Sequence, residues 1–264
     1  MFIKTFSPSK YNTYKECPLK YRYRYIDYLK DEYNETLSTD ALQFGSYIHK
    51  IFEDGVNATS IDELRQIGRD LRKNYQFKGR VKDTETCIKN FFEFNTNLEG
   101  SVSAEMLFSE QVIDDLSVNG IIDRVCKSKS GKYLVIDYKT SKREKTKREL
   151  QTDPQLMTYA AAIAKMYNVP VQNVSVSHYY PLTGNLVALR YLPPQISSFL
   201  RKLNQDKWAI RKAKVKDFKP RVNQYCNWCG YKDICPKQGA CPEKVNEALK
   251  KSKFGHGKPK GNKG

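Results

Sequence analysis

Two charged residues stand two positions apart at the end of an apolar run, in the stretch LVIDYKTSK. Leu134, Val135 and Ile136 are typical of a buried strand, and Asp137 and Lys139 follow them closely. Alternate residues of a strand point to the same side, so the acid and the lysine are neighbours at the edge of the apolar layer. An ordinary ion pair at a strand end would explain the pattern. Half of an active site would explain it as well.

A second carboxylate strengthens the case for chemistry. Asp123 lies fourteen residues before Asp137, at the end of the stretch NGIID. If the two strands pair, both carboxylates converge at one sheet edge, where Mg²⁺ or Mn²⁺ finds the clustered oxygens it requires. A bound metal lowers the pKa of a water, and Lys139 can offset developing negative charge. The pattern indicates a phosphodiester-cleaving site; the alternative is local pairing of Asp123 with Arg124 and of Asp137 with Lys139.

Three further features accompany these residues, and each has an ordinary explanation. His49, on a predicted helix, is a candidate ligand for manganese or a packing residue. Gln155 and Tyr159 are four residues apart on a later helix, where they could orient a water and touch a phosphate, or form an ordinary helix face. The basic run that contains Lys142 and Arg143 could bind DNA beside the site or be a solvated surface.

The cysteines near the C-terminus indicate a second metal site. Cys226, Cys229, Cys235 and Cys241 follow one another with spacings of two, five and five residues. Cysteines this close in a reduced compartment favour metal binding over free structural thiols. Zinc is possible, but a zinc ribbon usually has two Cys-x2-Cys knuckles and only one is present. The distant Cys17, which proline follows as it follows Cys235 and Cys241, is a candidate fourth ligand.

The periodicity of apolar residues predicts an α/β protein with a mixed central sheet flanked by helices. We expect helices from Pro8 and within 40–98, strands within 104–114, 116–128 and 131–140, a helix over 151–167, strands over 174–181 and 185–193, and a helix over 195–214. Cys87 and Cys126 fall within apolar patterns and are expected in the core. Four regions follow: a helical N-terminal part with one cluster cysteine (1–100), a core (101–215), a cysteine segment (216–245) and a disordered basic tail (246–264).

The net charge of +17 in 264 residues favours a polyanionic partner, with nucleic acid ahead of a membrane surface. No run of about 18 apolar residues is present, so we expect no membrane span. The N-terminus lacks a secretory apolar region, which predicts a cytoplasmic protein with reduced thiols.

In their order and spacing, these motifs resemble the RecB-like branch of the PD-(D/E)XK nuclease superfamily. More narrowly, they resemble its iron–sulfur members, the AddB nuclease domain and the CRISPR-associated RecB-like exonuclease. The shared series is Cys17-Pro18, His49, Gly120-x-x-Asp123, Asp137-x-Lys139, Gln155 to Tyr159, then Cys226, Cys229 and Cys235. Cys241 exceeds the four cluster ligands of the family.

The resemblance implies a restriction-endonuclease-like core and assigns roles to its residues. The metal ligands would be His49, Asp123, Asp137 and the Tyr138 carbonyl; Lys139 would be catalytic, and Gln155 and Tyr159 would position substrate and water. Glu105 matches an acidic position before the sheet and would be a secondary site residue. A 4Fe–4S cluster would be held by Cys17, Cys226, Cys229 and Cys235.

The function that the resemblance implies is a Mg²⁺- or Mn²⁺-dependent deoxyribonuclease, an exonuclease on DNA ends or single strands in recombination, repair or replication. No helicase motif is visible, so the nuclease would stand alone or work with a helicase or recombination partner. Two alternatives remain: a cluster-stabilised DNA-binding module that does not cut, and an endonuclease of the same superfamily that recognises a DNA sequence or structure.

Overall fold

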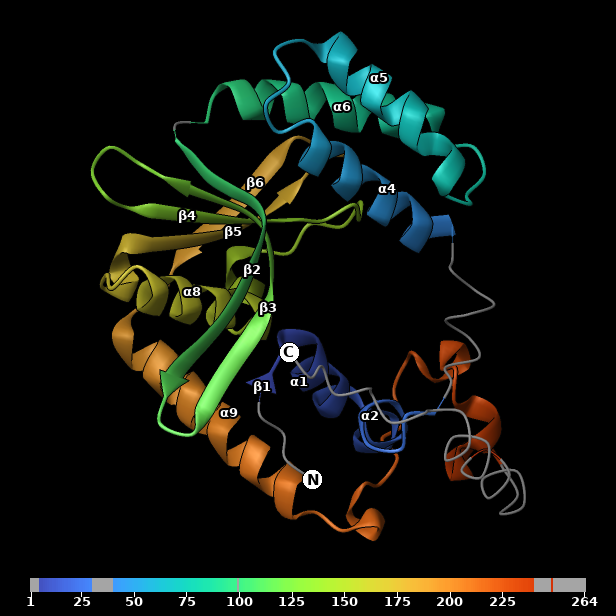
Figure 1. Cartoon of the computed structure of the whole chain (residues 1–264). Coiled ribbons are helices and arrows are strands. Elements are labelled where there is room, and N and C mark those ends of the chain that lie inside the picture. Colours follow the sequence, from blue (N-terminus) through green and yellow to red (C-terminus); the bar gives the residue numbers. More distant parts are fainter. Residues whose placement is uncertain (1–4, 30–39, 99, 240–247, 249–264) are drawn as a thin grey trace, which may run out of the picture. The chain divides into compact units, whose positions relative to one another are not determined.

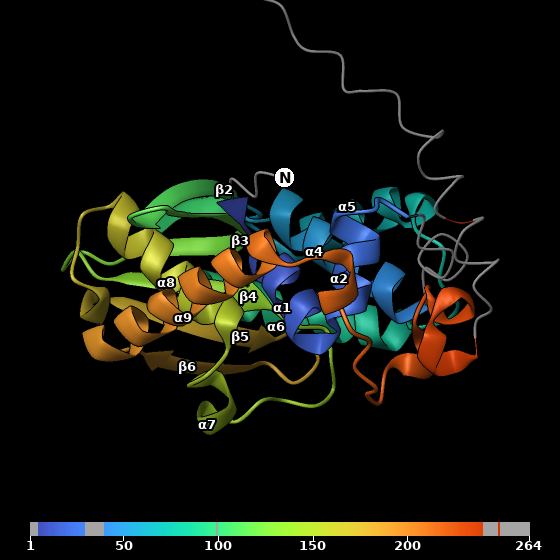
Figure 2. The same ribbon diagram turned by 90° about the horizontal axis from the view of Figure 1, so that it is seen from below.

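A mixed six-stranded sheet is the centre of the computed structural model, which describes residues 5–29, 40–98, 100–239 and 248 (Figure 1). Its strands are β1 (Thr5–Phe6), β2 (Ser101–Ile113), β3 (Leu116–Lys127), β4 (Tyr133–Tyr138), β5 (Val174–Tyr180) and β6 (Asn185–Arg190). β3 is antiparallel to β2 and β4, β4 is parallel to β5, and β5 is antiparallel to β6. Figure 2 shows these strands side by side in that order. The predicted mixed sheet is confirmed.

The short strand β1 pairs in parallel with the beginning of β3. It has no counterpart in the sequence prediction, because two residues are too few for a periodic pattern.

The helices occupy the segments that the apolar periodicity predicts. They are α1 (Pro8–Glu16), α2 (Pro18–Tyr25), α4 (Asp40–Asp54), α5 (Ile61–Leu71), α6 (Val81–Thr96), α7 (Lys147–Leu150), α8 (Pro154–Met166) and α9 (Pro193–Lys212). Short 3₁₀ turns are η1 (Arg72–Asn74), η2 (Val171–Asn173), η3 (Val215–Asp217), η4 (Cys226–Trp228), η5 (Lys232–Ile234) and η6 (Pro236–Gln238).

The chain divides into two compact units. The first contains Met1–Pro8 and Thr39–Trp208, and the second contains Ser9–Ser38 and Ala209–Gly264. Each unit is described by itself below.

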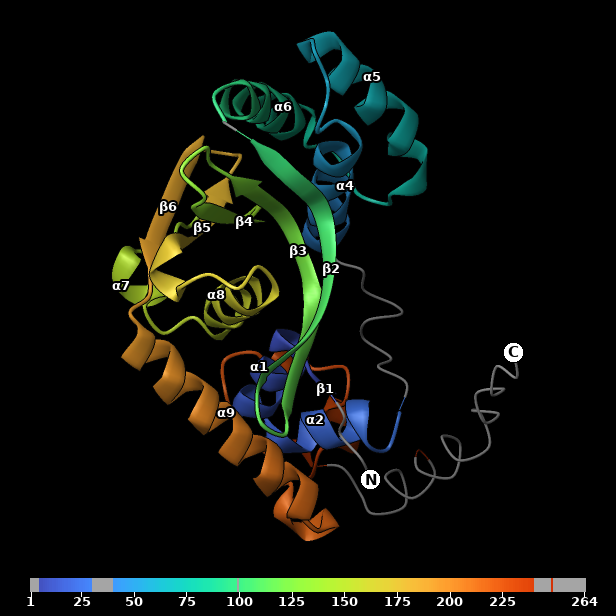
Figure 3. The same cartoon turned by 60° about the vertical axis from the view of Figure 1, so that its left-hand side comes forward.

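In the first unit, α4, α5 and α6 cover one face of the sheet and α8 covers the other (Figure 3). Residues three and four apart on α4, such as Ile48, Ile51 and Phe52, are buried against α6 and the sheet. Phe52 stacks on Phe91 with ring centroids 3.9 Å apart and meets Tyr138 edge-on at 5.1 Å. This core fixes the position of α4 relative to the end of β4.

On the opposite face, α8 begins at a strong N-terminal cap. The Asp153 side chain accepts hydrogen bonds from the backbone N–H groups of Gln155 and Leu156. Such a cap satisfies donors that the first helical turn leaves open. Phe108 of β2 packs edge-on against Tyr159 of α8, with ring centroids 5.8 Å apart. The cap therefore sets where Gln155 enters the site described below.

The second unit joins two segments that are distant in the sequence. Leu19, Tyr23 and Leu29 form a small core with Tyr231. The Tyr23 hydroxyl donates to the carbonyl of Ile234 at 3.2 Å, and the Tyr231 hydroxyl donates to the carbonyl of Leu29 at 3.2 Å. These long-range contacts hold the N-terminal segment against the cysteine segment.

Within the described ranges, no helix is long and apolar enough to cross a membrane. The tail predicted to be disordered (246–264) lies outside the described residues except for Ala248, and Cys241 lies outside them as well. Cys87 and Cys126 are 0% and 3% exposed, which confirms their expected place in the core.

Replacement of Phe52 by alanine tests the packing of α4. Phe52 is 1% exposed, so Phe52→Ala should lower the free energy of unfolding by about 3–5 kcal/mol through lost burial and the cavity left behind. Val81→Ala is the control, because Val81 is 78% exposed and should change stability by less than about 0.5 kcal/mol. Urea denaturation followed by circular dichroism measures both. Equal stability of the two variants would contradict the assignment of Phe52 to the core.

Candidate functional site

The paired strands β3 and β4 separate at the point where their acidic residues begin. The last pair of the ladder at this end is Arg124 with Ile136, so Asp123 and Asp137 lie next to each other just beyond it. Oδ2 of Asp123 accepts the backbone N–H of Tyr138 at 2.6 Å. This hydrogen bond replaces the next bond of the ladder and aims the Asp123 side chain along the sheet edge.

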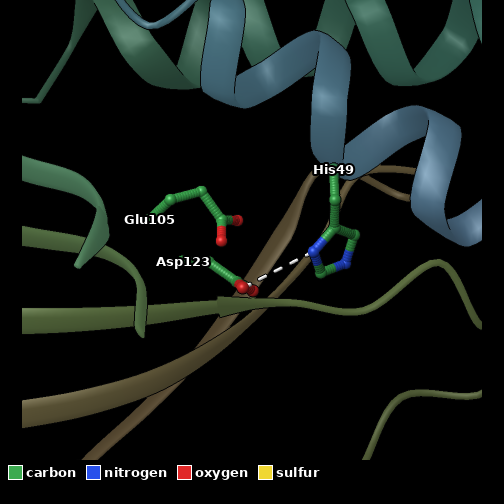
Figure 4. Close-up of side chains that lie close together, drawn as sticks. All are labelled: His49, Glu105 and Asp123. Atoms are coloured by element: carbon green, nitrogen blue, oxygen red, sulfur yellow. Dashed lines mark ion pairs between the residues drawn. The ribbon is translucent and has the colours of Figure 1, made fainter. Parts of the chain in front are cut away.

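Three candidate metal ligands converge at this edge (Figure 4). His49 comes from α4, Glu105 from β2 and Asp123 from β3, and one ligand atom from each lies within 4.8 Å of the others. Nδ1 of His49 is 3.5 Å from Oδ1 of Asp123, and its Nε2 is 3.0 Å from the carbonyl oxygen of Tyr138. Two carboxylates and one imidazole form a donor set suited to Mn²⁺, and also to Mg²⁺ with added waters.

The approach of α4 to the strand end depends on a glycine. A Cβ atom at Gly45 would lie 3.2 Å from Oγ1 of Thr140, which is closer than most such contacts. His49 follows Gly45 by one turn and therefore lies on the same helix face. The small residue lets the helix bring the imidazole close to the carboxylates.

Glu105 was not among the predicted metal ligands, and its backbone explains why sequence patterns could not place it. Its φ of 49° is left-handed within a strand whose neighbours Ala104 and Met106 pair regularly with β3. This conformation is strained for a residue other than glycine, asparagine or aspartate, and it turns the side chain toward Asp123. Burial and the nearby negative charges of Asp123 and Glu53 raise the pKa of Glu105.

The same electrostatics affect His49. Burial alone would lower the pKa of its imidazole, but the hydrogen bond and charge attraction of Asp123 outweigh burial, and the pKa is raised. The cluster thus gathers negative charge that a cation would relieve.

An open cleft of about 670 Å³ gives access to the cluster. Its lining comes from α4, β2, β3 and the chain beyond β4, and includes His49, Glu105, Asp123, Lys50 and Ile121. The metal-binding candidates therefore face a space large enough for part of a nucleotide chain.

Asp137 lies on the protected side of the site. It is 3% exposed, and its Oδ2 is 2.5 Å from Nζ of Lys139. Its Oδ1 accepts a hydrogen bond from Nε2 of Gln155 at 2.9 Å. Burial raises the pKa of Asp137 to about 6 despite the opposing effect of Lys139. The pKa of Lys139 is also raised, since its attraction to Asp137 outweighs the effect of burial.

Gln155 connects the acid–lysine pair to α8. Its Oε1 accepts from Nζ of Lys139 at 3.2 Å, and its Nε2 donates to the Tyr159 hydroxyl at 2.8 Å. The Tyr159 hydroxyl in turn donates to the carbonyl of Ile121 at 2.7 Å. Tyr159 is 4% exposed, so in this structure it anchors the network, and its contact with DNA stays a prediction.

His178 is a site neighbour that the sequence analysis did not select. It is the cross-strand partner of Asp137 on β5, is 0% exposed, and its Nε2 lies 3.7 Å from Oδ2 of Asp137. Burial and the positive charges of Lys139 and Lys145 lower its pKa to about 4. A neutral imidazole therefore packs behind the carboxylate. The only sequence signal was a histidine inside the apolar run VSVSHYY.

The basic run after β4 is on the surface. Lys142 and Arg143 are exposed, and Arg143 forms a 2.5 Å ion pair with Glu149. Lys145 pairs with Asp153, the cap of α8, at 2.7 Å.

In the second unit, the four predicted cluster cysteines line one small cavity of about 30 Å³: Cys17, Cys226, Cys229 and Cys235. Backbone N–H groups point at two of the sulfur atoms, from Arg221 to Cys17 at 3.4 Å and from Asn223 to Cys226 at 3.3 Å. Donors of this kind stabilise thiolates that bind a metal or cluster. The thiols thus fit a shared metal or cluster site.

Comparison with known proteins agrees with this geometry. Residues 5–236 match the PD-(D/E)XK nuclease superfamily. One of the subunits of the ATP-dependent helicase/deoxyribonuclease from Streptococcus agalactiae, in serotypes Ia and V, is 22% identical over 182 residues, which are 60% of this chain. The matched part spans only 16% of the length of those relatives.

A solved structure from Eubacterium rectale, provisionally assigned as an exonuclease, has a similar fold. Its TM-score is 0.55 at 15% sequence identity, over 86% of this chain and 87% of the other. At this identity the likeness concerns the fold alone.

Removal of one hydroxyl tests the anchoring role of Tyr159. Tyr159→Phe leaves the Ile121 carbonyl and one Gln155 donor without their partner, so it should lower the free energy of unfolding by about 1–3 kcal/mol. Tyr167→Phe is the matched control, because the Tyr167 hydroxyl contacts only the Met106 sulfur, at 3.8 Å, among the bonds described for it. Chemical denaturation compares the two. A loss as large in Tyr167→Phe would show that the network around Gln155 has no special weight.

Proposed function

Because the chain belongs to the PD-(D/E)XK nuclease superfamily, we propose that it is a deoxyribonuclease that hydrolyses phosphodiester bonds with Mg²⁺ or Mn²⁺. The observation that carries the proposal is the convergence of His49, Glu105 and Asp123 beside the Asp137–Lys139 pair. The word deoxyribonuclease also stands in the names of the streptococcal relatives.

The residues at the sheet edge fit a hard divalent cation. Glu105 and Asp123 offer carboxylate oxygens, His49 offers an imidazole nitrogen, and the Tyr138 carbonyl lies beside that nitrogen. A cation bound there would activate water and stabilise negative charge on phosphate oxygens. Asp137 would join the ligand set as the strand end adjusts, as the motif resemblance implies.

Lys139 is the residue that we propose to act on the substrate. Its ammonium group is held by Asp137 and Gln155 at the end of β4, so it is directed without being fully enclosed. A cation in this position can orient the attacking water or offset the charge that develops on phosphate. Gln155 would keep the lysine in place and contact the same water.

The net charge of +17 supports DNA as the substrate, since basic residues bind the phosphate backbone. Lys142 and Arg143 are candidates for these contacts. We favour an exonuclease on DNA ends or single strands, working with a helicase or recombination partner, in keeping with the printed names of the similar proteins. A module that binds DNA without cutting is less consistent with the site, because uncompensated carboxylates repel phosphate.

For the second unit, we propose a structural 4Fe–4S cluster at Cys17, Cys226, Cys229 and Cys235. Support comes from the shared cavity and from the N–H groups directed at sulfur. A cluster supplies no step to phosphodiester hydrolysis, so its role would be to tie the two segments of this unit together. Zinc at the same thiols is the alternative.

A time course on end-labelled DNA tests the nuclease assignment. With Mn²⁺, the protein should shorten single- or double-stranded DNA from an end, whereas an endonuclease would release internal fragments. Asp123→Asn and Asp137→Asn should each lower the cleavage rate by about a hundredfold or more, because each removes a charge that organises the metal.

Asp62→Asn is the control for these variants, since Asp62 is an exposed residue of α5 that pairs with Arg65. It should cleave DNA at the wild-type rate. Wild-type protein without activity on either form of DNA would overturn the proposed function. Near-normal rates in Asp123→Asn or Asp137→Asn would remove that residue from the site.

Iron analysis of anaerobically purified protein tests the cluster. We expect about four irons per chain in the wild type. Cys17→Ala should lose iron and unfold at a lower temperature, because the link between the two segments is broken, and Cys241→Ala should keep the iron. The reverse pattern would make Cys241 the fourth ligand. Colourless protein with about one zinc per chain would establish the zinc alternative.

A further inference from the structure

An exposed apolar pair lies beside the metal-binding cluster. Leu107 of β2 and Ile121 of β3 are cross-strand partners, and they are 76% and 47% exposed. Cross-strand partners have their side chains in contact range. The two aliphatic side chains therefore form one continuous apolar surface.

The alternation of the strands places this pair on the same side as the candidate metal ligands. Phe108 and Ile122, the adjacent residues, are 5% and 0% exposed, and Phe108 packs on α8. Leu107 and Ile121 must therefore face away from α8, as Glu105 and Asp123 do two positions along each strand. Two residues of a strand span about 7 Å. Ile121 also lines the cleft that contains Glu105 and Asp123.

The apolar surface is limited to this position. The next pair along the same face is Ser109 with Asn119, and both residues are polar. Isolated exposed aliphatic residues are common and carry no meaning by themselves. Here two of them are paired, next to a cluster of carboxylates, and at the wall of the cleft through which a substrate would reach it.

We propose that Leu107 and Ile121 bind the nucleobase adjacent to the cleaved phosphodiester. This inference rests on the proposed function, which places a phosphate at the metal ligands. The base of an adjoining nucleotide then lies within reach of the next pair of residues on the strand face. Leucine and isoleucine are side chains that proteins place against or between bases, since the face of a base is apolar while phosphate and sugar are polar.

The backbone at this position is held firmly enough to serve as a platform. The Ile121 carbonyl accepts the hydrogen bond of the buried Tyr159 hydroxyl, which also binds Gln155. A base resting on Ile121 would thus have a fixed position relative to Gln155 and Lys139. On the other side of the cleft, Lys50 supplies positive charge for the chain of phosphates.

A cycle that combines protein variants with abasic DNA tests the contact. The cleavage position on a single-stranded oligonucleotide is mapped first with Mn²⁺. An abasic unit is then placed on either side of the cleaved bond in turn. For the wild type, kcat/KM should fall about tenfold when one of these bases is missing and stay unchanged when the other is missing.

Leu107→Thr and Ile121→Thr keep a residue suited to a strand but remove most of the apolar surface. Each should lower kcat/KM about tenfold on intact DNA and cause no further loss on the abasic DNA, because both changes delete the same contact. Both variants should bind Mn²⁺ as the wild type does. Leu186→Thr, on β6, is the control and should match the wild type on every substrate, since Leu186 is 38% exposed and lies on a different strand.

Three results would overturn the inference. Wild-type cleavage that does not depend on either base would do so, and so would losses in the variants that persist on abasic DNA. A wild-type oligomer that Leu107→Thr converts to a monomer, with base dependence absent, would make this surface a protein contact. Failure of the wild type to cleave any oligonucleotide would instead overturn the proposed function, and the inference with it.

Discussion

The buried charge of Asp137 is the constraint that organises the first unit. A carboxylate with 3% of its surface exposed is costly unless other groups compensate it. Lys139 provides opposite charge from the same strand, and Gln155 provides a hydrogen bond from α8. The fold must therefore place α8 with its N-terminus at the end of β4. The cap at Asp153 and the Tyr159 anchor achieve this placement, so the features that stabilise the helix also assemble the site.

The other half of the site is assembled at a cost in stability. Glu105 has a strained backbone, and its carboxylate lies near that of Asp123. Like charges at close range and a left-handed φ both disfavour this arrangement. The aromatic core around Phe52, Phe91 and Tyr138 keeps α4 and β4 in position in spite of it. A cation would remove the repulsion, so the apparent stability of this unit should depend on the concentration of divalent metal.

The fold and much of the site follow from local sequence patterns, whereas the rest depends on contacts that local patterns do not contain. The strands around Asp123 and Asp137 have clear apolar runs, and antiparallel neighbours joined by a short turn bring the two acids together. Gln155 and Tyr159 share a face because helical periodicity is regular. Glu105, in contrast, reaches the cluster through an irregular backbone angle inside a strand. His178 is hidden within an apolar run, and only the pairing of β5 with β4 reveals that it lies behind Asp137.

The architecture of the second unit has a consequence for biosynthesis. The bond from the Arg221 N–H to the Cys17 sulfur joins residues 204 positions apart. At about 5–20 residues per second, a ribosome needs roughly 10–40 s to make the intervening chain. During that interval the first thiol is outside the tunnel and its partners do not yet exist. Any loading of this site must therefore wait for the cysteine segment, and a nascent chain carries one unprotected, oxidisable cysteine until that segment emerges.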